Sequence, residues 1–293
     1  MQRLLCIGVA KTAYEPQRIK AEARALGISY TFAHWRELIF DLRGDDLKIT
    51  IARKKDVRLF DFVWMRSAKF AVPIVLAMEY LLACPKRKVL NDGFLKMPFR
   101  NNKFFQYAYL KKHNFPTMPS VMKIMCKHRQ HIDTYFSKPY ILKGVHGSKG
   151  KRVYKIDSAK NLKSLLEQFN STGMLAQQYL SIQSDYRVLL LGGIVLGAIK
   201  RSSKSSEFRT NFSLGGKVES IDLPDNVKEM VKGVALVFNA DFCGVDLIKH
   251  KDNYYILELN FTPGFEGFER ATGINVPGAC LNYLINKKSA TIV

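Results

Sequence analysis

The chain has 293 residues, of which 47% are hydrophobic, so it can bury a substantial core and an intrinsically disordered protein is excluded. Its 46 lysines and arginines exceed its 25 aspartates and glutamates, which gives a formal net charge of +21. This charge favours polyanionic partners: nucleic acid, acidic protein or peptide, phosphorylated small molecules or an anionic membrane surface. Charge alone does not choose among them.

Targeting signals and cysteine pairs are not evident in the sequence. Five widely separated cysteines without a CxxC pair predict reduced thiols and argue against a zinc site. The first apolar run, Leu4 to Ala10, is short, and Lys11 follows where a small-residue cleavage site would begin, so the run predicts a buried strand. No segment approaches the length of a transmembrane helix. We therefore expect a cytoplasmic protein without a membrane partner.

The first ninety residues alternate strand and helix patterns. Their predicted elements are strands at 4–9, 28–32 and 60–65, hairpin character at 47–52, and helices at 16–26 and 72–83. This order predicts a small open α/β domain with a mostly parallel sheet. No GxGxxG follows the first strand, which argues against dinucleotide binding. Arg66 comes just after a strand end, where open sheets bind ligands, although a surface arginine is the alternative.

The middle of the chain carries a glycine-rich, basic segment. A helix is predicted at 101–112, with Lys103 near its start, where the helix dipole disfavours a cation unless an anion is nearby. A short strand at 139–143 leads into the sequence GVHGSKGK at 144–151, whose backbone N–H groups can close over phosphates. The segment matches neither GxxxxGK[ST] nor GxGxxG, so a solvated basic turn remains the alternative.

The last part of the chain predicts a β-rich unit with one long helix. Its predicted elements are helices at 158–169, 225–238 and 276–285, and strands at 175–180, 186–191 and 194–199. The last two strands flank Gly192-Gly193, a strong hairpin signal. In the polar segment that follows, Arg209 and Asn211 alternate with phenylalanines, as residues do when they line one side of a cleft. A surface loop is the alternative.

The stretch from Phe242 to Gly267 is the most informative one for chemistry. Two β-rich runs flank the polar residues 250–253, and Asp246, Glu258 and Asn260 share one face. The opposite face is predicted to hold Val245, Leu247, Tyr255, Leu257 and Leu259. A three-residue turn would place Asp246 directly opposite Glu258, roughly 5 Å away between Cβ atoms. Carboxylate and amide oxygens suit Mg²⁺, so a Mg²⁺–nucleotide site is predicted, with a solvated hairpin face as the alternative.

Several segments together resemble one superfamily. The matching segments are ILKGVHGSKG (141–150), QQYL (177–180), DYR (185–187), EFRTNFSLGG (207–216), GVDL (244–247) and LELNFTPGFEGFERATGINVPG (257–278). They resemble the ATP-grasp superfamily, and within it the RimK-like glutamate ligases of the ribosomal protein S6 modification type. The last segment is the most specific, and residues 91–120 resemble the family's entry into its central domain.

The resemblance implies an α/β fold with α+β character in the C-terminal half. It implies an open N-terminal pre-ATP-grasp α/β domain, a small central lid domain and a C-terminal antiparallel-sheet domain that carries the Mg²⁺ site. The corresponding ranges in this chain are 1–97, 98–176 and 177–293.

The resemblance also implies roles for individual residues. It implies that ATP is bound by Lys103, Lys143, Gly147, Ser148, Gly150, Gln178, Tyr179, Leu180, Asp185, Arg209 and Asn211. Lys143 and Arg209 would be catalytic, and Asp246, Glu258 and Asn260 would be the metal ligands. Family members commonly have Glu at the position of Gln178, which puts the nucleotide preference in doubt.

The function that the resemblance implies is an ADP-forming, ATP-dependent acid–amino-acid ligase. It would add glutamate, or another amino acid, through an acyl phosphate to an acidic acceptor: a protein C-terminus, a peptide or a glutamylated small molecule. Its cofactors would be ATP and two Mg²⁺ ions, for which Mn²⁺ could substitute. A homo-oligomer is compatible with the sequence.

Three alternatives remain open. The chain would also fit an ATP-grasp ligase that acts on an amino-acid carrier protein or matures a peptide, or a fold relative that binds nucleotide without ligating. From another class, a basic nucleic-acid-binding protein fits the charge of +21. Nucleic acid is not the expected partner, because the sequence has no helix-turn-helix, zinc-finger or RNP signature and such a protein leaves the matched acids unexplained.

Overall fold

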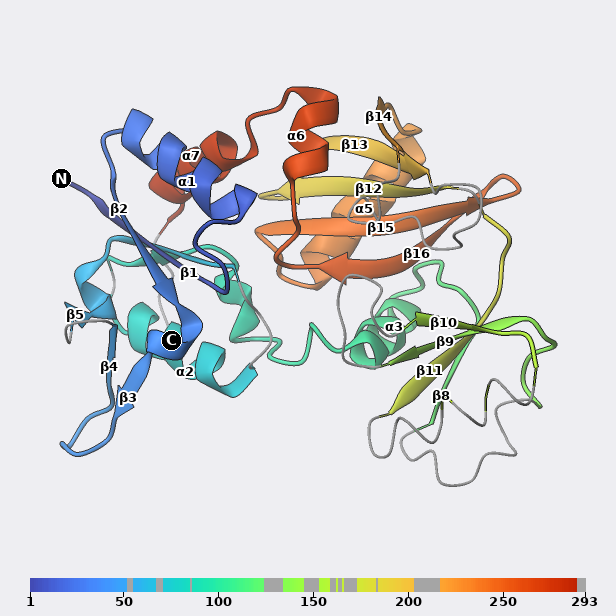
Figure 1. Ribbon diagram of the computed structural model, residues 1–293, viewed down its shortest axis with the longest axis horizontal. Coiled ribbons are helices and arrows are strands. Elements are labelled where there is room, and N and C mark those ends of the chain that lie inside the picture. Colours follow the sequence, from blue (N-terminus) through green and yellow to red (C-terminus); the bar gives the residue numbers. More distant parts are fainter. Residues whose placement is uncertain are drawn as a thin grey trace.

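The computed structural model shows three main sheets, with the parallel one at the left of Figure 1, the five-stranded one at the upper right and a four-stranded antiparallel one at the lower right. The residues that the structure describes are 1–51, 55–66, 71–84, 86–123, 134–144, 153–158, 162, 165, 173–182, 184–202 and 217–288. No helix in this part of the chain is long and apolar enough to span a membrane. The mixed α/β architecture agrees with the predicted fold class.

The N-terminal part is an open parallel sheet, as the alternating patterns predict. Its strands pair in the order β2–β1–β6–β7 and are β1 (Arg3–Gly8), β2 (Ser29–His34), β6 (Phe62–Met65) and β7 (Lys88–Val89). A small antiparallel sheet replaces the predicted hairpin and contains β3 (Ile39–Asp41), β4 (Lys48–Ile51) and β5 (Lys55–Asp56). The helices of this part are α1 (Tyr14–Ala25) and α2 (Ala71–Leu82), with 3-10 turns η1 (Trp35–Glu37), η3 (Val57–Leu59) and η4 (Asp92–Phe94).

The central part is a four-stranded antiparallel sheet with its own small core. Its strands pair in the order β10–β9–β11–β8 and are β8 (Ser120–Lys123), β9 (Tyr140–Gly144), β10 (Val153–Ile156) and β11 (Met174–Gln178). Helix α3 (Lys103–Lys112) precedes the sheet and begins at the N-cap Asn102, whose side chain accepts a hydrogen bond from Phe105 N. Of the predicted helix at 158–169, residues 158, 162 and 165 are described; residue 158 is a bend, and residues 162 and 165 are helical.

The C-terminal part is a five-stranded antiparallel sheet. Its strands pair in the order β14–β13–β12–β15–β16 and are β12 (Ser184–Leu191), β13 (Ile194–Ser202), β14 (Lys217–Ile221), β15 (Phe242–His250) and β16 (Asn253–Asn260). Its helices are α5 (Asp225–Val237), α6 (Glu266–Thr272) and α7 (Val276–Asn286). The predicted turn between β12 and β13 is present, with φ of +57° at Gly192 and +80° at Gly193, which is the backbone that glycine adopts at no steric cost.

The hairpin of β15 and β16 reaches the predicted register by another route. Its turn has two residues and not three, because His250 pairs with Asn253. That turn alone would put Asp246 opposite Leu257. A bulge at Leu257 adds one residue to β16, and Asp246 therefore pairs with Glu258 after all.

The same bulge changes which side chains of β16 are buried. Leu247 and Leu259 are buried as predicted. Strict alternation also assigns Tyr255 and Leu257 to the core face, but Ile256 is the residue that is buried there. The prediction for these two residues was wrong because alternation with a period of two does not continue across a bulge.

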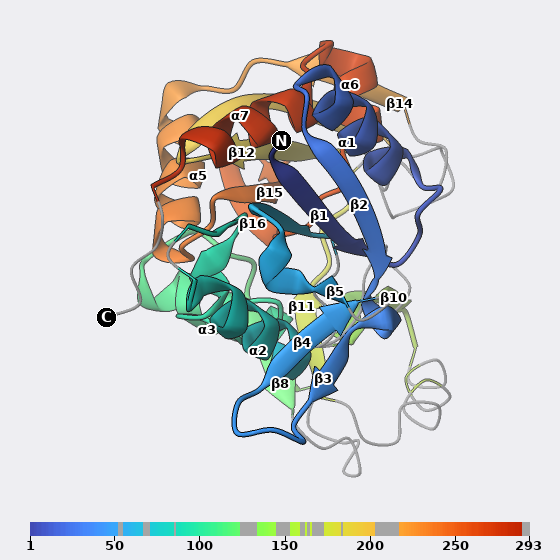
Figure 2. The ribbon, with the colours of Figure 1, turned by 90° about the vertical axis from the view of Figure 1, so that its left-hand side faces the viewer.

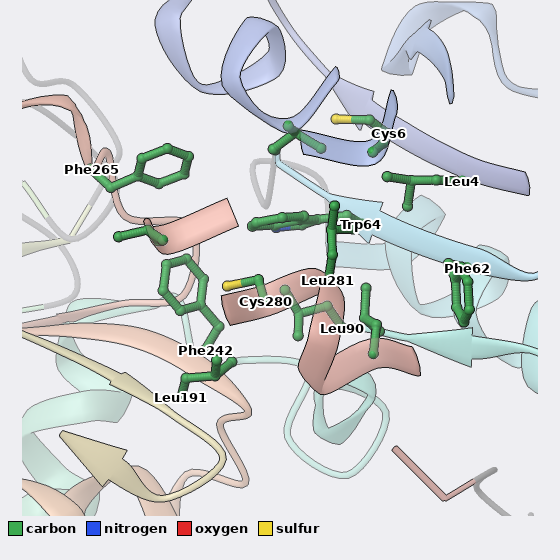
Figure 3. Close-up of a cluster of buried hydrophobic side chains, with 14 of the residues drawn as sticks. Leu4, Cys6, Phe62, Trp64, Leu90, Leu191, Phe242, Phe265, Cys280 and Leu281 are labelled. Carbon is green, nitrogen blue, oxygen red and sulfur yellow. The ribbon is translucent and has the colours of Figure 1, made fainter. Parts of the chain in front are cut away.

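The N-terminal and C-terminal sheets share a hydrophobic core. Figure 3 shows Trp64 of β6 and Leu4 of β1 in one cluster with Phe242 of β15 and with Cys280 and Leu281 of α7. Helix α7 also packs against α1, and the two lie side by side in Figures 1 and 2. The N-terminal part therefore packs against the C-terminal part through a common core. The limits of the three predicted domains stay predictions.

A buried polar clamp holds the segment that leaves the N-terminal sheet. Asn91 has a positive φ of 66°, and its side chain exchanges hydrogen bonds with the backbone of Phe242 while also donating to Phe261 O. Arg100 is fully buried and donates to the carbonyls of Phe238, Asn239 and Asn91. The segment around the predicted domain limit at residues 97 and 98 is thus held against the C-terminal part.

Candidate active site

One face of the five-stranded sheet carries a ladder of charged side chains. Arg201 on β13 pairs across the strands with Asp185 on β12. Arg187, two residues further along β12, pairs with Asp246 on β15, which in turn pairs with Glu258 on β16. Cross-strand partners lie within contact distance of each other on the same face. The sheet register therefore lines up two arginines and three carboxylates over four strands, with Asp246 and Glu258 as neighbouring acids at one end.

The ion pairs in this ladder are short and mostly buried. Arg201 binds Asp185 in a bidentate manner at 2.6 and 2.7 Å, and Arg187 binds Asp246 with two contacts of 2.7 Å. Arg201 also reaches Asp246, at 3.1 Å from Nη2 to Oδ2. Such bidentate, charge-assisted pairs fix both partners in place. Arg201 thus connects Asp185 with Asp246.

The arginines determine the charge state of Asp246. Burial alone would raise the pKa of this carboxyl, but Arg187 and Arg201 outweigh burial and lower the pKa to about 2. The carboxylates of Asp246 and Asp185 in turn raise the pKa of Arg201. Asp246 is therefore ionised throughout the physiological pH range, as a ligand for a cation must be.

Stability should fall in acid because of Asp246. Its pKa is lower in the folded chain than the unfolded value of about 3.9, so its contribution is complete above about pH 4 and is lost as the pH falls toward 2. We expect a loss of about 2–3 kcal/mol in the free energy of unfolding from this group. Denaturant titrations between pH 6 and 2 measure it. Asp246→Asn should be less stable at pH 6 and show a shallower decline, and parallel curves would contradict the assignment.

Glu258 is the most accessible acid of the ladder, and Lys103 approaches it from α3. The distance from Lys103 Nζ to Glu258 Oε1 is 2.5 Å, and the Glu258 side chain is 40% exposed. Gln106, one turn further along α3, exchanges hydrogen bonds with both backbone groups of Leu259 and so fixes the helix on β16. Glu258 is thus the anion that compensates a lysine at the start of a helix.

Lys143 on β9 adds a second cation from the central sheet. Burial and the neighbouring charge of Lys103 lower its pKa to about 8, while Glu258 and Asp246 act in the opposite direction. Two lysines from different elements therefore interact with the acids of the hairpin. A polyphosphate would compensate both.

The predicted metal ligands fit a hard cation that shares its coordination shell with phosphate. Asn260 follows Glu258 on the same face, and its Oδ1 accepts a hydrogen bond from Thr262 N at 3.0 Å. No group of three or more His, Cys, Asp and Glu side chains placed to hold a metal occurs in the described part of the chain. Mg²⁺ needs only one or two carboxylates when phosphate oxygens and water complete its shell. The donor set of Asp246, Glu258 and Asn260 therefore suits Mg²⁺ together with a nucleotide.

The predicted ATP-binding residues Gln178, Tyr179 and Leu180 lie where strand β11 of the central sheet ends. Gln178 is the last residue of β11, its side chain is exposed, and its N–H donates to Pro119 O at 3.4 Å. Tyr179 and Leu180 follow, and both are half-buried. Lys155 Nζ lies 4.8 Å from the centre of the Tyr179 ring, a cation–π contact.

Five predicted site residues lie outside the described part of the chain: Gly147, Ser148, Gly150, Arg209 and Asn211. Two arginines of the ladder were not predicted. The sequence held a signal for Arg187, because Asp185 and Arg187 stand two residues apart on a strand and so share a face. It held none for Arg201, because the Gly192-Gly193 turn alone would set Lys200 opposite Asp185, and a bulge at Leu196 shifts the register by one residue.

The model of the RimK-like ATP-grasp domain matches residues 100–284, which is more than half of the chain. The chain belongs to the RimK-like ATP-grasp family. Its matched region contains the whole charged ladder, Lys103 and Lys143.

Curated relatives of this RimK-like chain include proteins named probable alpha-L-glutamate ligase. The one from Psychromonas ingrahamii is 33% identical over 150 residues, which cover 50% of each chain. The one from Legionella pneumophila (strain Corby) is 34% identical over 158 residues, which cover 53% of this chain and 52% of the relative. The chain thus spans about half the length of the curated relatives that it matches.

Solved structures share the fold over nearly the whole RimK-like chain. The ATP-grasp ligase PsnB complexed with minimal precursor has a TM-score of 0.72 at 22% identity, covering 97% of this chain and 98% of that one. The macrocyclase MdnC bound with precursor peptide MdnA, from Microcystis aeruginosa MRC, has a TM-score of 0.73 at 16% identity, covering 98% and 100%. The ATP-grasp fold predicted from the sequence is therefore confirmed.

Proposed function

We propose that the chain is an ATP-dependent ligase that joins a carboxylate to the amine of an amino acid, most simply glutamate, with release of ADP. The observation that carries this proposal is the meeting of Lys103 and Lys143 with Asp246 and Glu258 inside a RimK-like ATP-grasp domain. The names of the curated relatives support ligation, and the solved PsnB complex with Mg and ADP supports the choice of nucleotide and metal.

Each described residue then has a task in holding the triphosphate. Lys143 and Lys103 neutralise phosphate oxygens, and Gln178, Tyr179 and Leu180 hold the adenine through the end of β11. Binding of ATP would separate Lys103 from Glu258, because the ammonium group would turn to the phosphates. The segment around Gly147, Ser148 and Gly150 is proposed to close over them, with Arg209 and Asn211 beside the reacting phosphate.

Asp246, Glu258 and Asn260 would hold two Mg²⁺ ions, which Mn²⁺ can replace. The ions would neutralise negative charge on the phosphate oxygens. Arg187 and Arg201 fix the Asp246 carboxylate in its ionised form. Phosphoryl transfer depends mainly on positioning and charge and requires no covalent nucleophile from the protein.

The proposed reaction has two steps. A carboxylate oxygen of the acceptor attacks the γ-phosphorus of ATP, which forms an acyl phosphate and releases ADP. The amine of the amino acid then attacks the acyl carbon, loses a proton and expels phosphate, which leaves an amide. Lys143 and Arg209 would offset the negative charge on the transferring group, and a closed lid would keep water from the acyl phosphate.

Binding of ATP should be coupled to proton uptake through Lys143. Its pKa of about 8 in the free protein should rise when phosphate oxygens surround it, so the protein takes up a proton near pH 8–9, and ATP affinity falls as the pH increases above about 8. Calorimetry of ATP binding in buffers of different ionisation enthalpy measures this uptake. Lys143→Arg should abolish it, whereas equal uptake in both proteins would contradict the role of Lys143.

The basic surplus of the chain fits an acidic acceptor. A net charge of +21 attracts a glutamate tail, an acidic protein C-terminus or a glutamylated small molecule. We expect that raising the salt concentration from 50 to 300 mM increases the KM of the acceptor several-fold more than that of ATP, because long-range attraction is screened while close phosphate contacts persist. Equal changes in both constants would contradict an acidic acceptor.

Peptide maturation is a second candidate for the same chemistry. The PsnB and MdnC structures hold precursor peptides, and the fold similarity to them extends over almost the whole chain. Peptide maturation would join two side chains of one peptide, whereas glutamate ligation adds the mass of an amino acid. We place either activity in the cytoplasm, in line with the free Cys6, Cys84, Cys243 and Cys280 among the described residues.

A screen of ADP release tests the proposal. Acidic peptides, carrier proteins and glutamylated cofactors are combined with each of the twenty amino acids, and products are identified by mass spectrometry. An increase in acceptor mass by one or more residues, with one ADP for each bond, supports glutamate-type ligation; a loss of water from a peptide supports maturation. Retention on nucleic acid without ADP release under any condition would support a nucleic-acid-binding protein and refute the ligase.

A further inference from the structure

Arg66 and Glu15 lie together at the carboxyl edge of the parallel sheet. Arg66 directly follows β6 and continues its ladder, since its N–H donates to Ile7 O at 2.7 Å. Glu15 lies in the first turn of α1, which follows β1. Open parallel sheets bind their ligands at this edge. The sequence predicted Arg66 to be either a ligand-binding or a surface residue. In the structure Arg66 is partly buried.

The guanidinium of Arg66 joins this edge to the loop that follows the metal-ligand strand. Its Nη2 donates to Pro263 O at 2.9 Å, and its Cζ lies 5.4 Å from the centre of the Phe265 ring. Pro263 is three residues after Asn260, so the chain between them spans at most about 11 Å. Arg66 is therefore joined to the loop that begins directly after the predicted metal ligands.

One nitrogen of Arg66 has no partner. Among the described residues its Nη1 is buried and makes no hydrogen bond. Burial lowers the pKa of this guanidinium, and the charge of Glu15 is the largest influence that opposes the decrease. Buried donors almost always have an acceptor in native proteins, so an unpaired guanidinium nitrogen points to an anion that is bound during function.

Glu15 reaches the loop beside Pro263, where residue 264 is glycine. A Cβ atom at Gly264 would lie only 3.0 Å from Glu15 Oε1. Within the described residues, Glu15 forms no ion pair within 4.0 Å, so its carboxylate is available to a cation. The edge therefore offers one donor for an anion and one carboxylate for a cation, and both lie against the Pro263-Gly264 loop that follows the predicted metal ligands in sequence.

We propose that this edge binds the incoming amino acid, with its α-carboxylate on Arg66 and its α-ammonium group on Glu15. The proposal rests on the proposed ligase function and adds to it the location of the amino-acid substrate. It requires a zwitterion, since an amino acid presents both charges on one carbon. Transfer of a proton from the ammonium group to the Glu15 carboxylate then leaves the amine free to attack the acyl phosphate.

Binding without turnover tests the site. The protein is saturated with Mg²⁺ and a non-hydrolysable ATP analogue, and each of the twenty amino acids is titrated by calorimetry. At least one should bind, and its α-carboxamide should bind about tenfold to a hundredfold more weakly, because it lacks the anion that Arg66 needs. If no amino acid binds, or if the amino acid and its α-carboxamide bind equally tightly, the inference is overturned. Binding of the ATP analogue and release of ADP report separately on the proposed function.

Variants identify the residues. Arg66→Met should bind the amino acid at least tenfold more weakly and no longer distinguish it from its amide, with unchanged affinity for the ATP analogue. Arg18→Met is the matched control, because Arg18 also joins α1 to the C-terminal part, through Glu269 at 3.1 Å, but has its partners in place. Should Arg66→Met fail to fold, two other binding measurements decide the question. One is the binding of amino-acid methyl esters to Glu15→Gln, and the other is the comparison of the amino acid with its amide in the wild-type protein. Unchanged discrimination in Arg66→Met would overturn the inference.

Discussion

Glu258→Gln is expected to lower ligase turnover by about 10³-fold while leaving the fold intact. The substitution keeps the size of the side chain but removes one of two carboxylates that would hold Mg²⁺, whose charge stabilisation is worth several kcal/mol. Glu258 is 40% exposed, and Lys103 is its ion-pair partner among the described residues. Its loss should therefore change the free energy of unfolding by only about 1 kcal/mol. ADP release and denaturant titration measure the two effects.

A matched control distinguishes loss of the site from loss of charge. Glu266→Gln removes a carboxylate from α6 whose partner Arg270 is on the surface, 2.6 Å away, and should leave turnover unchanged. If Glu258→Gln retained turnover near that of the wild type, Glu258 would not be a metal ligand. Arg209→Ala is expected to lose activity in the same way, with the fold intact.

Arg100→Met is expected to cause the largest loss of stability, about 3–5 kcal/mol. The guanidinium is fully buried, donates three hydrogen bonds to backbone carbonyls, and lies 4.7 and 4.3 Å from the ring centres of Phe94 and Phe261. Methionine fills similar space but leaves the carbonyls without donors, and each unsatisfied buried group costs about 1–3 kcal/mol. Equilibrium denaturation in urea measures the change.

An exposed arginine provides the control for Arg100. Arg43→Met removes a guanidinium whose side chain is 88% exposed and which pairs with Asp41 in the β3–β4 hairpin. Its free energy of unfolding should stay within about 0.5 kcal/mol of the wild type. A similar small effect for Arg100→Met would show that the clamp does not hold the two parts of the protein together.

The sequence predicted the strands of the candidate site well because these depend on local patterns. Hydrophobic alternation and turn residues located β12, β13, β15 and β16, and the pairing of Asp246 with Glu258 was predicted correctly. The route to that pairing was not, since a two-residue turn and a bulge at Leu257 replace the three-residue turn. A bulge depends on packing of the whole hairpin, which no local pattern reports.

Long-range polar contacts are the other part that the sequence did not disclose. Asn91 and Arg100 flank the predicted domain limit at residues 97 and 98, yet their partners lie about 140 to 170 residues further along the chain. The same applies to the shared core of Trp64 and Cys280, which joins the N-terminal sheet to α7. Contacts of this kind follow from tertiary packing, so composition and periodicity could not predict them.

Mg²⁺-dependent uptake of ATP tests the central claim most directly. Calorimetric titration of a non-hydrolysable ATP analogue should give one binding site for wild type in the presence of Mg²⁺, much weaker binding after chelation, and little response to Mg²⁺ in Glu258→Gln. No uptake by the wild-type chain, or uptake that is equally tight with and without Mg²⁺, would contradict a site in which Asp246, Glu258 and Asn260 hold the metal against a triphosphate.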